Sequence, residues 1–148
     1  LDAADGETVA LAELAAAVEL SPAHLQRAFR RRIGLSPKQY ALAHRAERLR
    51  RGLGSGRTVL DAGFEAGYGS ASRLYDEAAR SLGMTPGRFR DGGRGVRIAF
   101  AHRQTALGHL LLAATDRGLC AVRLGDSVAA LRAGLAKEFP RATLAHSE

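Results

Sequence analysis

The side chains with the clearest chemistry lie on a short arginine-rich segment. Glutamine can pair with adenine and arginine with guanine through two hydrogen bonds each, so Gln26 and Arg27 are suited to reading base edges in a DNA major groove. The arginines that follow are suited to phosphate oxygens, and His24 is kept as a further phosphate contact. The residues of this segment that we predict to contact DNA are Ala23, His24, Gln26, Arg27, Arg30 and Arg31, with Arg32 as an additional phosphate ligand.

A second and weaker set of candidates follows 49 residues later. Small and hydroxyl-bearing side chains replace most of the arginines there, and Asp76 and Glu77 would repel nearby phosphates. We therefore predict fewer direct DNA contacts from this set, which comprises Ser70, Ala71, Ser72, Arg73 and Asp76.

A repeated phrase follows each of these two sets. The residues GLSPKQY at 34–40 return as GMTPGRF at 83–89. In each copy the glycine can end a helix in the left-handed conformation, the hydroxyl can cap the next helix, and proline suits the first turn of that helix. One structural unit is therefore predicted to occur twice, with the phrase at its end.

Apolar spacing predicts two helices in the first unit. The first helix begins after Thr8, and its apolar stripe is Leu11, Leu14, Ala15 and Val18. Ser21 and Pro22 open the second helix, whose predicted buried face is Leu25, Ala28, Phe29 and Ile33. Because the turn between the helices is only about three residues long, the pair is predicted to form a helix-turn-helix over about residues 8–34.

The second unit, about residues 58–83, is predicted at the same offset, with Leu60 corresponding to Leu11 and Ser70 to Ser21. Its first helix covers roughly residues 59–66, and the predicted buried side of its second helix is Ala71, Leu74, Tyr75, Ala78 and Leu82. A connecting helix over about residues 37–53 begins with a capping box of Ser36 and Gln39. Its apolar positions are Leu42, Ala46, Leu49 and Leu53.

The charge of the chain favours an anionic partner. The formal net charge is +7, and residues 21–57 hold ten Lys or Arg and one acid, whereas residues 58–93 hold four basic and five acidic residues. Basic composition alone fits a nucleic acid, an acidic protein or a membrane surface. The clustering places the positive field on the first unit.

Cysteine content and hydropathy limit the class of protein. The single cysteine, Cys120, excludes an internal disulfide framework and a cysteine-rich zinc site, so we expect a reducing compartment, no metal and no cofactor. No apolar run approaches the ~18 residues of a spanning helix, and no signal-peptide pattern is present. We therefore expect a cytoplasmic protein without a membrane partner. The start at Leu1 and the patternless residues 142–148 suggest a piece of a longer protein.

After a glycine-rich hinge at residues 92–95, the pattern changes from helical spacing to alternation. Strands are predicted in residues 96–101, 110–114 and 119–124, with a tight turn at 115–118. A helix follows from Asp126 or Ser127 to Pro140, with Val128, Leu131, Leu135 and Phe139 on its apolar side. Residues 93–148 are thus predicted to be a small α+β unit, a three-stranded antiparallel sheet plus one helix. Such a unit buries little, so we expect it to pack on the first domain or on a missing one.

The helix caps and outward arginines carry a family resemblance. Ala15, the segment SPAHLQRAF at 21–29, the two repeated phrases and Gly67-Tyr68 resemble the AraC-type DNA-binding domain, over roughly residues 8–92. The resemblance implies a mostly α domain in residues 1–92 that reads two successive major-groove faces of double-stranded DNA as a monomer, and it implies RNA polymerase as a partner. It also implies base contacts from Ala23, Gln26 and Arg27, with a second set from Ala71, Ser72 and Asp76.

Residues 107–113 and 116–126 resemble the N-terminal subdomain of the methylated-DNA cysteine methyltransferases. In this order the two parts resemble the Ada-type adaptive-response regulators, which sense DNA alkylation, activate transcription of repair genes and remove the O6-methyl group of guanine. The Pro-Cys-His-Arg acceptor motif and the four-cysteine zinc domain of that family are not in this sequence. Cys120 lies in a predicted strand with no histidine nearby in sequence, so it is predicted to be a buried, inert thiol. The chain thus holds no catalytic motif.

Three functions remain open at this stage. The preferred one is a sequence-specific DNA-binding transcription regulator of the response to DNA alkylation. The alternative is a fragment of a methylated-DNA cysteine methyltransferase whose acceptor cysteine lies beyond this chain, and the third is a basic protein-interaction module. Helical repeats with a solvated arginine face would need no DNA at all, but the duplication of cap, proline and outward polar positions favours DNA reading.

Overall fold

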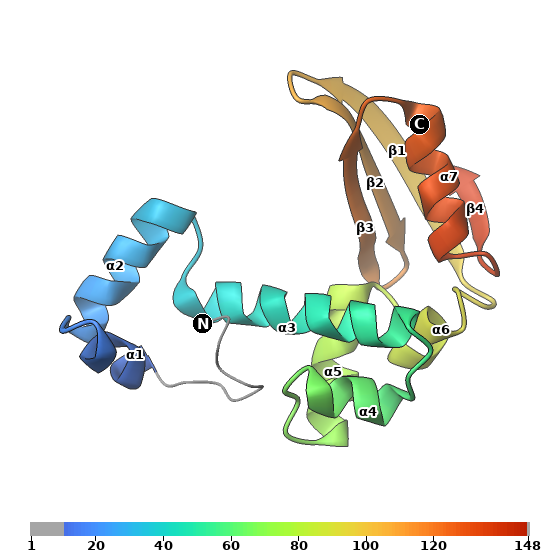
Figure 1. Cartoon of the computed structure of the whole chain (residues 1–148). Helices are drawn as coiled ribbons and strands as arrows, with labels where there is room; N and C mark the ends of the chain where they lie inside the picture. The colour runs from blue at the N-terminus through green and yellow to red at the C-terminus, as the bar shows by residue number, and fades with distance from the viewer. Residues whose placement is uncertain (1–10, 148) are drawn as a thin grey trace.

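The computed structural model describes residues 11–147. Figure 1 shows a helical part followed by a twisted sheet that stands on the far end of the longest helix. The elements in chain order are α1 (Leu11–Ala17), α2 (Pro22–Ile33), α3 (Pro37–Gly54), α4 (Val59–Glu65), α5 (Ala71–Leu82), α6 (Pro86–Arg90), β1 (Arg97–Thr105), β2 (Gly108–Thr115), β3 (Gly118–Gly125), α7 (Val128–Glu138) and β4 (Thr143–His146). Within the described residues, no helix combines the length and apolarity needed to cross a membrane.

The helix ends confirm the predicted capping signals. The side chains of Ser21 and Ser70 accept hydrogen bonds from backbone N–H groups three residues later, and the glycines that follow α2 and α5 are left-handed. Ser36 and Gln39 form the predicted capping box at the start of α3. The two helix pairs and the long connecting helix are therefore present. The beginning of the first helix, predicted after Thr8, lies outside the described residues.

The two helix pairs are repeats with an insertion of one residue. α5 begins 49 residues after α2, but α4 ends only 48 residues after α1. Equivalent hydrogen bonds in the two turns are also 48 residues apart, because Leu20 N–H donates to Ala15 O and Tyr68 N–H donates to Gly63 O. The predicted correspondence of Leu60 with Leu11 is therefore wrong. The counterpart of Leu11 is Val59, which is buried, whereas Leu60 is 46% exposed.

Several predicted buried faces are narrower than the apolar spacing indicated. In α5, Leu74, Ala78 and Leu82 are buried, but Ala71 is exposed and Tyr75 is 47% exposed. No residue of α2 is fully buried, and Ile33 at its end is 49% exposed. The predicted stripes of α1 and α3 also include two exposed residues, Val18 and Leu42. Among the described residues, α1 and α2 have few neighbours beyond each other and the start of α3, as Figure 1 shows, which accounts for the exposure of Val18, Ile33 and Leu42.

The sheet has four strands, and the prediction of three is wrong. The strand order is β3-β2-β1-β4, with β1, β2 and β3 antiparallel and β4 parallel to β1. Residues 143–146, predicted to be without pattern, form β4, which α7 brings back beside the start of β1. The segment at 92–95, predicted to be a hinge, is packed, because Arg141 N–H donates to Gly92 O at 2.9 Å and Gly93 lies against Ala142.

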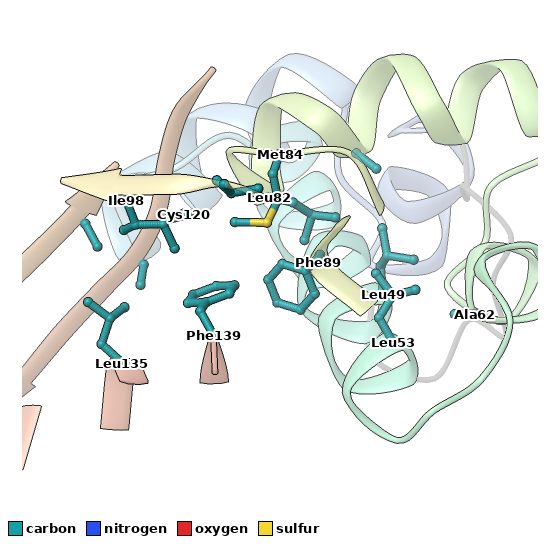
Figure 2. Close-up of a cluster of buried hydrophobic side chains, with 14 of the residues drawn as sticks. Leu49, Leu53, Ala62, Leu82, Met84, Phe89, Ile98, Cys120, Leu135 and Phe139 are labelled. Atoms are coloured by element: carbon teal, nitrogen blue, oxygen red, sulfur yellow. The ribbon is translucent and has the colours of Figure 1, made fainter. Parts of the chain in front are cut away.

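One hydrophobic core joins the sheet to the second helix pair. Leu49 and Leu53 of α3, Leu82 of α5, Ile98 of β1 and Phe139 after α7 belong to the same buried cluster, which Figure 2 shows. The cluster includes no described residue of α1 or α2. The sheet therefore packs on the helical part, one of the two arrangements expected, and the first helix pair lies outside this common core.

The contact between sheet and helices centres on the glycine of the second repeated phrase. A Cβ at Gly83 would lie 2.7 Å from the carbonyl oxygens of Gly118 and Leu119, and the residue has a φ of +65°, so this close contact requires glycine. Thr115 donates its hydroxyl hydrogen to Gly83 O. In the first copy of the phrase, Gly34 has open space around the same position. The two copies thus have different surroundings, although their sequences match.

Arg50 of α3 completes this contact. Its Nη1 donates to Cys120 O at 2.9 Å and its Nη2 donates to Ser81 O at 2.8 Å. A register shift opposite Ala113 and Ala114 leaves Cys120 as the extra residue of a β-bulge, and Ser81 lies in the last turn of α5, where carbonyls have no partner within the helix. Arg50 therefore donates hydrogen bonds to two partly buried carbonyl groups, which lie where the sheet and the helix do not supply a backbone N–H donor.

Candidate DNA-binding surface

The predicted residues of the first unit share one exposed face of α2. Ala23, Gln26, Arg27 and Arg30 are spaced three and four residues apart and form a stripe, with His24 and Arg31 beside it, and all six are exposed. On the opposite side, Phe29 is half-buried and its ring packs edge-on against Tyr40 at 5.6 Å between centroids. The packing of α2 on α3 therefore directs the polar stripe toward solvent.

The arginines of this stripe are available to a ligand. Within the described part of the chain, Arg27, Arg30 and Arg31 form no ion pair. A helix with an unpaired cationic stripe and an adjacent amide side chain has the donors needed for base edges and phosphates. This face is the strongest candidate site that the structure contains for a nucleic acid.

The second recognition helix, α5, presents a mainly uncharged face. Ser70, Ala71, Ser72, Arg73 and Asp76 are all exposed, as the predicted contact set requires. The charge of Glu77 is compensated, however, because its Oε2 lies 3.5 Å from Nη1 of Arg45, although the Glu77 side chain is 43% exposed. The predicted repulsion of phosphates by Glu77 is therefore offset within the protein.

Tyr75 is a further candidate DNA contact, which the apolar spacing of α5 did not indicate. It was predicted to be buried, because it fits a stripe with Leu74 and Ala78, yet about half of the residue is exposed, one turn along α5 from Ser72. A tyrosine combines an apolar ring with a hydroxyl group, which suits both thymine methyl groups and phosphate oxygens. In the sequence, the exposure of Tyr75 was indicated by its position at the edge of the apolar stripe.

Ion pairs and burial make part of the positive charge of residues 21–57 inaccessible to a ligand. Arg51 pairs with Glu47 at 3.9 Å, and Arg57 pairs with Glu65. Arg45 and Arg50 point into the molecule, as their contacts with Glu77 and with backbone carbonyls show. Among residues 21–57, the exposed arginines of α2 and the neighbouring Lys38 therefore carry most of the positive charge that forms no ion pair with another described residue.

The single cysteine is placed as predicted. Cys120 is fully buried in β3, and burial raises the pKa of its thiol above the ordinary value, while the nearby Arg50 opposes part of that increase. A buried thiol with a raised pKa is a poor nucleophile, because little thiolate forms at neutral pH. Cys120 therefore acts as a core residue.

Three proteins are similar to this chain over large parts of its length. The regulatory protein ada of Salmonella typhimurium is 42% identical over 134 residues, which are 90% of this chain and 38% of that protein. The bifunctional transcriptional activator/DNA repair enzyme Ada of Escherichia coli is 40% identical, with the same coverage. A solved structure of a protein of unknown function from Listeria innocua has a TM-score of 0.52 at 20% identity, covering 58% of this chain and 83% of its own, which shows a shared fold.

These similarities confirm the resemblance seen in the sequence. The two Ada proteins match across both the helical part and the sheet, although the chain spans only about two-fifths of the length of these curated relatives. A family model described as "Helix-turn-helix domain" matches residues 14–92, more than half of the chain, and contains both helix pairs. The chain belongs to this helix-turn-helix family, of the AraC type.

Proposed function

We propose that this chain is the DNA-reading part of a transcription regulator of the response to DNA alkylation. Its two similar relatives carry the names of a regulatory protein and of a transcriptional activator that is also a DNA repair enzyme. The observation that supports the proposal most is the exposed arginine stripe of α2, which forms no ion pair among residues 11–147, in a fold that holds a second helix-turn-helix on the same long helix.

In this proposal the chain binds double-stranded DNA as a monomer. The N-terminal half of α2 enters one major groove, where Gln26 and Arg27 read base edges, and Arg30 and Arg31 contact phosphates. α5 enters the next groove with a smaller set of contacts from Ser72, Tyr75 and Asp76. Affinity then comes mainly from the first unit, and the second unit sets position along the DNA. RNA polymerase is the partner proposed for activation.

The test is to replace Arg27 by alanine. A preferred duplex is first selected with the unaltered chain from a random library, and affinities are then measured for duplexes with every single base-pair change. Arg27→Ala should cost roughly 1–3 kcal/mol and remove the preference at one base-pair position. Arg103→Ala is the matched control, because Arg103 is an exposed arginine of β1, outside both helix pairs. It should leave the base preferences unchanged.

Two results would redirect the proposal. Equal weakening by Arg27→Ala on all sequences would assign Arg27 to a phosphate. Absence of measurable affinity for any duplex would favour the protein-interaction function instead. A genuine DNA complex should also weaken steeply with added salt, because binding releases counterions from the phosphates.

A further inference from the structure

Arg45 of α3 lies against the turn and the second helix of the second helix-turn-helix. Its guanidinium carbon lies 5.2 Å from the ring centroid of Tyr68, in the turn between α4 and α5, and its Nη1 lies 3.5 Å from Glu77 Oε2 on α5. The Arg45 side chain is only 16% exposed. Since the charge of this arginine is enclosed by the second unit, it cannot serve as a general phosphate ligand.

The partners of Arg45 are themselves constrained. Tyr68 is buried, and burial raises the pKa of its hydroxyl while the positive charge of Arg45 lowers it. Glu77 Oε2 is a buried atom without a hydrogen-bond partner among the described residues, so the charge of Arg45 is its compensation. A cation between a ring and a buried carboxylate oxygen favours one orientation of α5 relative to α3.

A second arginine holds the other end of α5. Arg50, five residues further along α3, donates to Ser81 O at 2.8 Å in the last turn of α5. A cation at a helix C-terminus is favourable, because it satisfies a free carbonyl and opposes the helix dipole. Arg45 and Arg50 thus contact α5 at two points, Glu77 and Ser81, which are about one turn apart.

The opposite end of α3 carries the first unit. α2 joins α3 through residues 34–36, and α2 makes no contribution to the common core. The distance and angle between the two recognition helices therefore depend on how α5 is fixed to α3. Apolar packing at Leu49 and Leu53 holds the helices together, and directional contacts add resistance to rotation of α5 on α3.

We infer that Arg45, through Tyr68 and Glu77, is a positioning residue that sets the spacing between the two DNA half-sites. The inference rests on the proposed function. It assigns Glu77, an acidic residue on a recognition helix, to orientation of that helix rather than to contact with DNA. Arg50 supports the same orientation from the C-terminal end of α5.

The test uses a series of duplexes derived from the sequence that the unaltered chain selects from a random library. Zero, one or two base pairs are inserted or removed between the two half-sites, and the affinity of each duplex is measured. The unaltered chain should prefer one spacing. Arg45→Met keeps the bulk of the side chain without its charge, and it should reduce this preference by about 5- to 10-fold, the effect expected from loss of its ion pair with Glu77 and its cation–π contact with Tyr68. Binding to a duplex that contains only the first half-site should not change.

Two further variants separate orientation from stability. Arg45→Lys retains the cation and should restore most of the spacing preference. Glu77→Gln keeps the shape of the partner and removes its charge, so it should weaken the preference even where Arg45→Met does not fold. Thermal unfolding is recorded for all variants, because a purely structural role lowers the melting temperature but leaves the spacing profile of the folded protein unchanged.

The outcomes distinguish the two proposals. An unchanged spacing profile in both Arg45→Met and Glu77→Gln, with DNA binding intact, overturns the role of Arg45 alone. Failure of the unaltered chain to bind any duplex overturns the proposed function, and this inference with it.

Discussion

Gly63 lies where α4 crosses α5, and its replacement by alanine tests how closely the two helices pack. Gly63 is buried in α4 and faces Leu74 of α5. A Cβ added there would lie 3.0 Å from Leu74 Cδ1 and closer still to Cδ2. Leu74 is 2% exposed, so its side chain is packed among core neighbours. The methyl group can be accommodated only if Leu74 changes its side-chain conformation or α4 and α5 move apart.

The expected magnitude combines two opposing effects. Overpacking of a close-packed core costs roughly 1–3 kcal/mol. Replacing glycine by alanine inside a helix returns about 0.5–1 kcal/mol, because the unfolded chain loses conformational freedom. We therefore expect Gly63→Ala to destabilise the fold by about 1–2 kcal/mol and to lower the melting midpoint by roughly 2–8 °C.

The first helix pair supports this reasoning. At the corresponding position, 48 residues earlier, it holds Ala15, which is 1% exposed. An alanine is tolerated there because Leu25, the counterpart of Leu74, is only half-buried. The crossing of α1 and α2 thus leaves room for the methyl group that the crossing of α4 and α5 excludes.

The assay is urea unfolding followed by circular dichroism, with Gly54→Ala as the matched control. Gly54 is a helical glycine at the end of α3, and an added Cβ would have open space around it. Gly54→Ala should be as stable as the unaltered chain or slightly more stable. If Gly63→Ala were equally stable, the helix crossing would be adjustable and the argument from close packing would be wrong.

Two further predictions concern the turn of the first unit and the buried thiol. Glu19 has a φ of +54°, whereas its counterpart Gly67 has a φ of +91°. Glu19→Gly should therefore relieve backbone strain of about 1 kcal/mol and slow amide hydrogen exchange in α2. Faster exchange in the variant would contradict this prediction. Burial raises the pKa of Cys120, so the stability that its protonated thiol contributes is fully present below the unfolded-state pKa, about 8.5, and is lost as pH rises through the folded-state pKa. Urea unfolding should therefore show that raising the pH from 7 to 10 reduces the stability of Cys120→Ala less than that of the unaltered chain. In a separate experiment, mass spectrometry after incubation with O6-methylguanine DNA should find Cys120 unmodified. A methylated Cys120 would favour the repair-enzyme alternative.

The helix boundaries and the candidate face of α2 were predictable because their determinants are local. Ser21, Ser36 and Ser70 cap helices through hydrogen bonds that span three residues, and Gly34 and Gly83 end helices through their own backbone angles. The polar stripe from Ala23 to Arg30 follows from helical spacing alone. Such interactions lie within one segment of chain, so a sequence specifies them without knowledge of the fold.

Burial and strand pairing were predicted less well because they depend on distant segments. Tyr75 fits the apolar stripe of α5, yet it remains 47% exposed. β4 is a short strand of four residues without alternation, and it exists because α7 returns the chain to the side of β1. The 48-residue offset between α1 and α4 likewise became visible only when Val59, rather than Leu60, was found to be buried.

The sequence by itself determined that a helix-turn-helix occurs twice and that α2 carries the chemistry to read DNA, since repeats, caps and side-chain types are properties of the chain. Only the tertiary structure decided which positive charges reach a ligand. Arg27 and Arg45 look alike in the sequence, but α5 packs on α3 and encloses Arg45 between Tyr68 and Glu77, while no described residue pairs with Arg27. The physical reason is that the availability of a charge depends on contacts across the fold, which side-chain type and spacing do not contain.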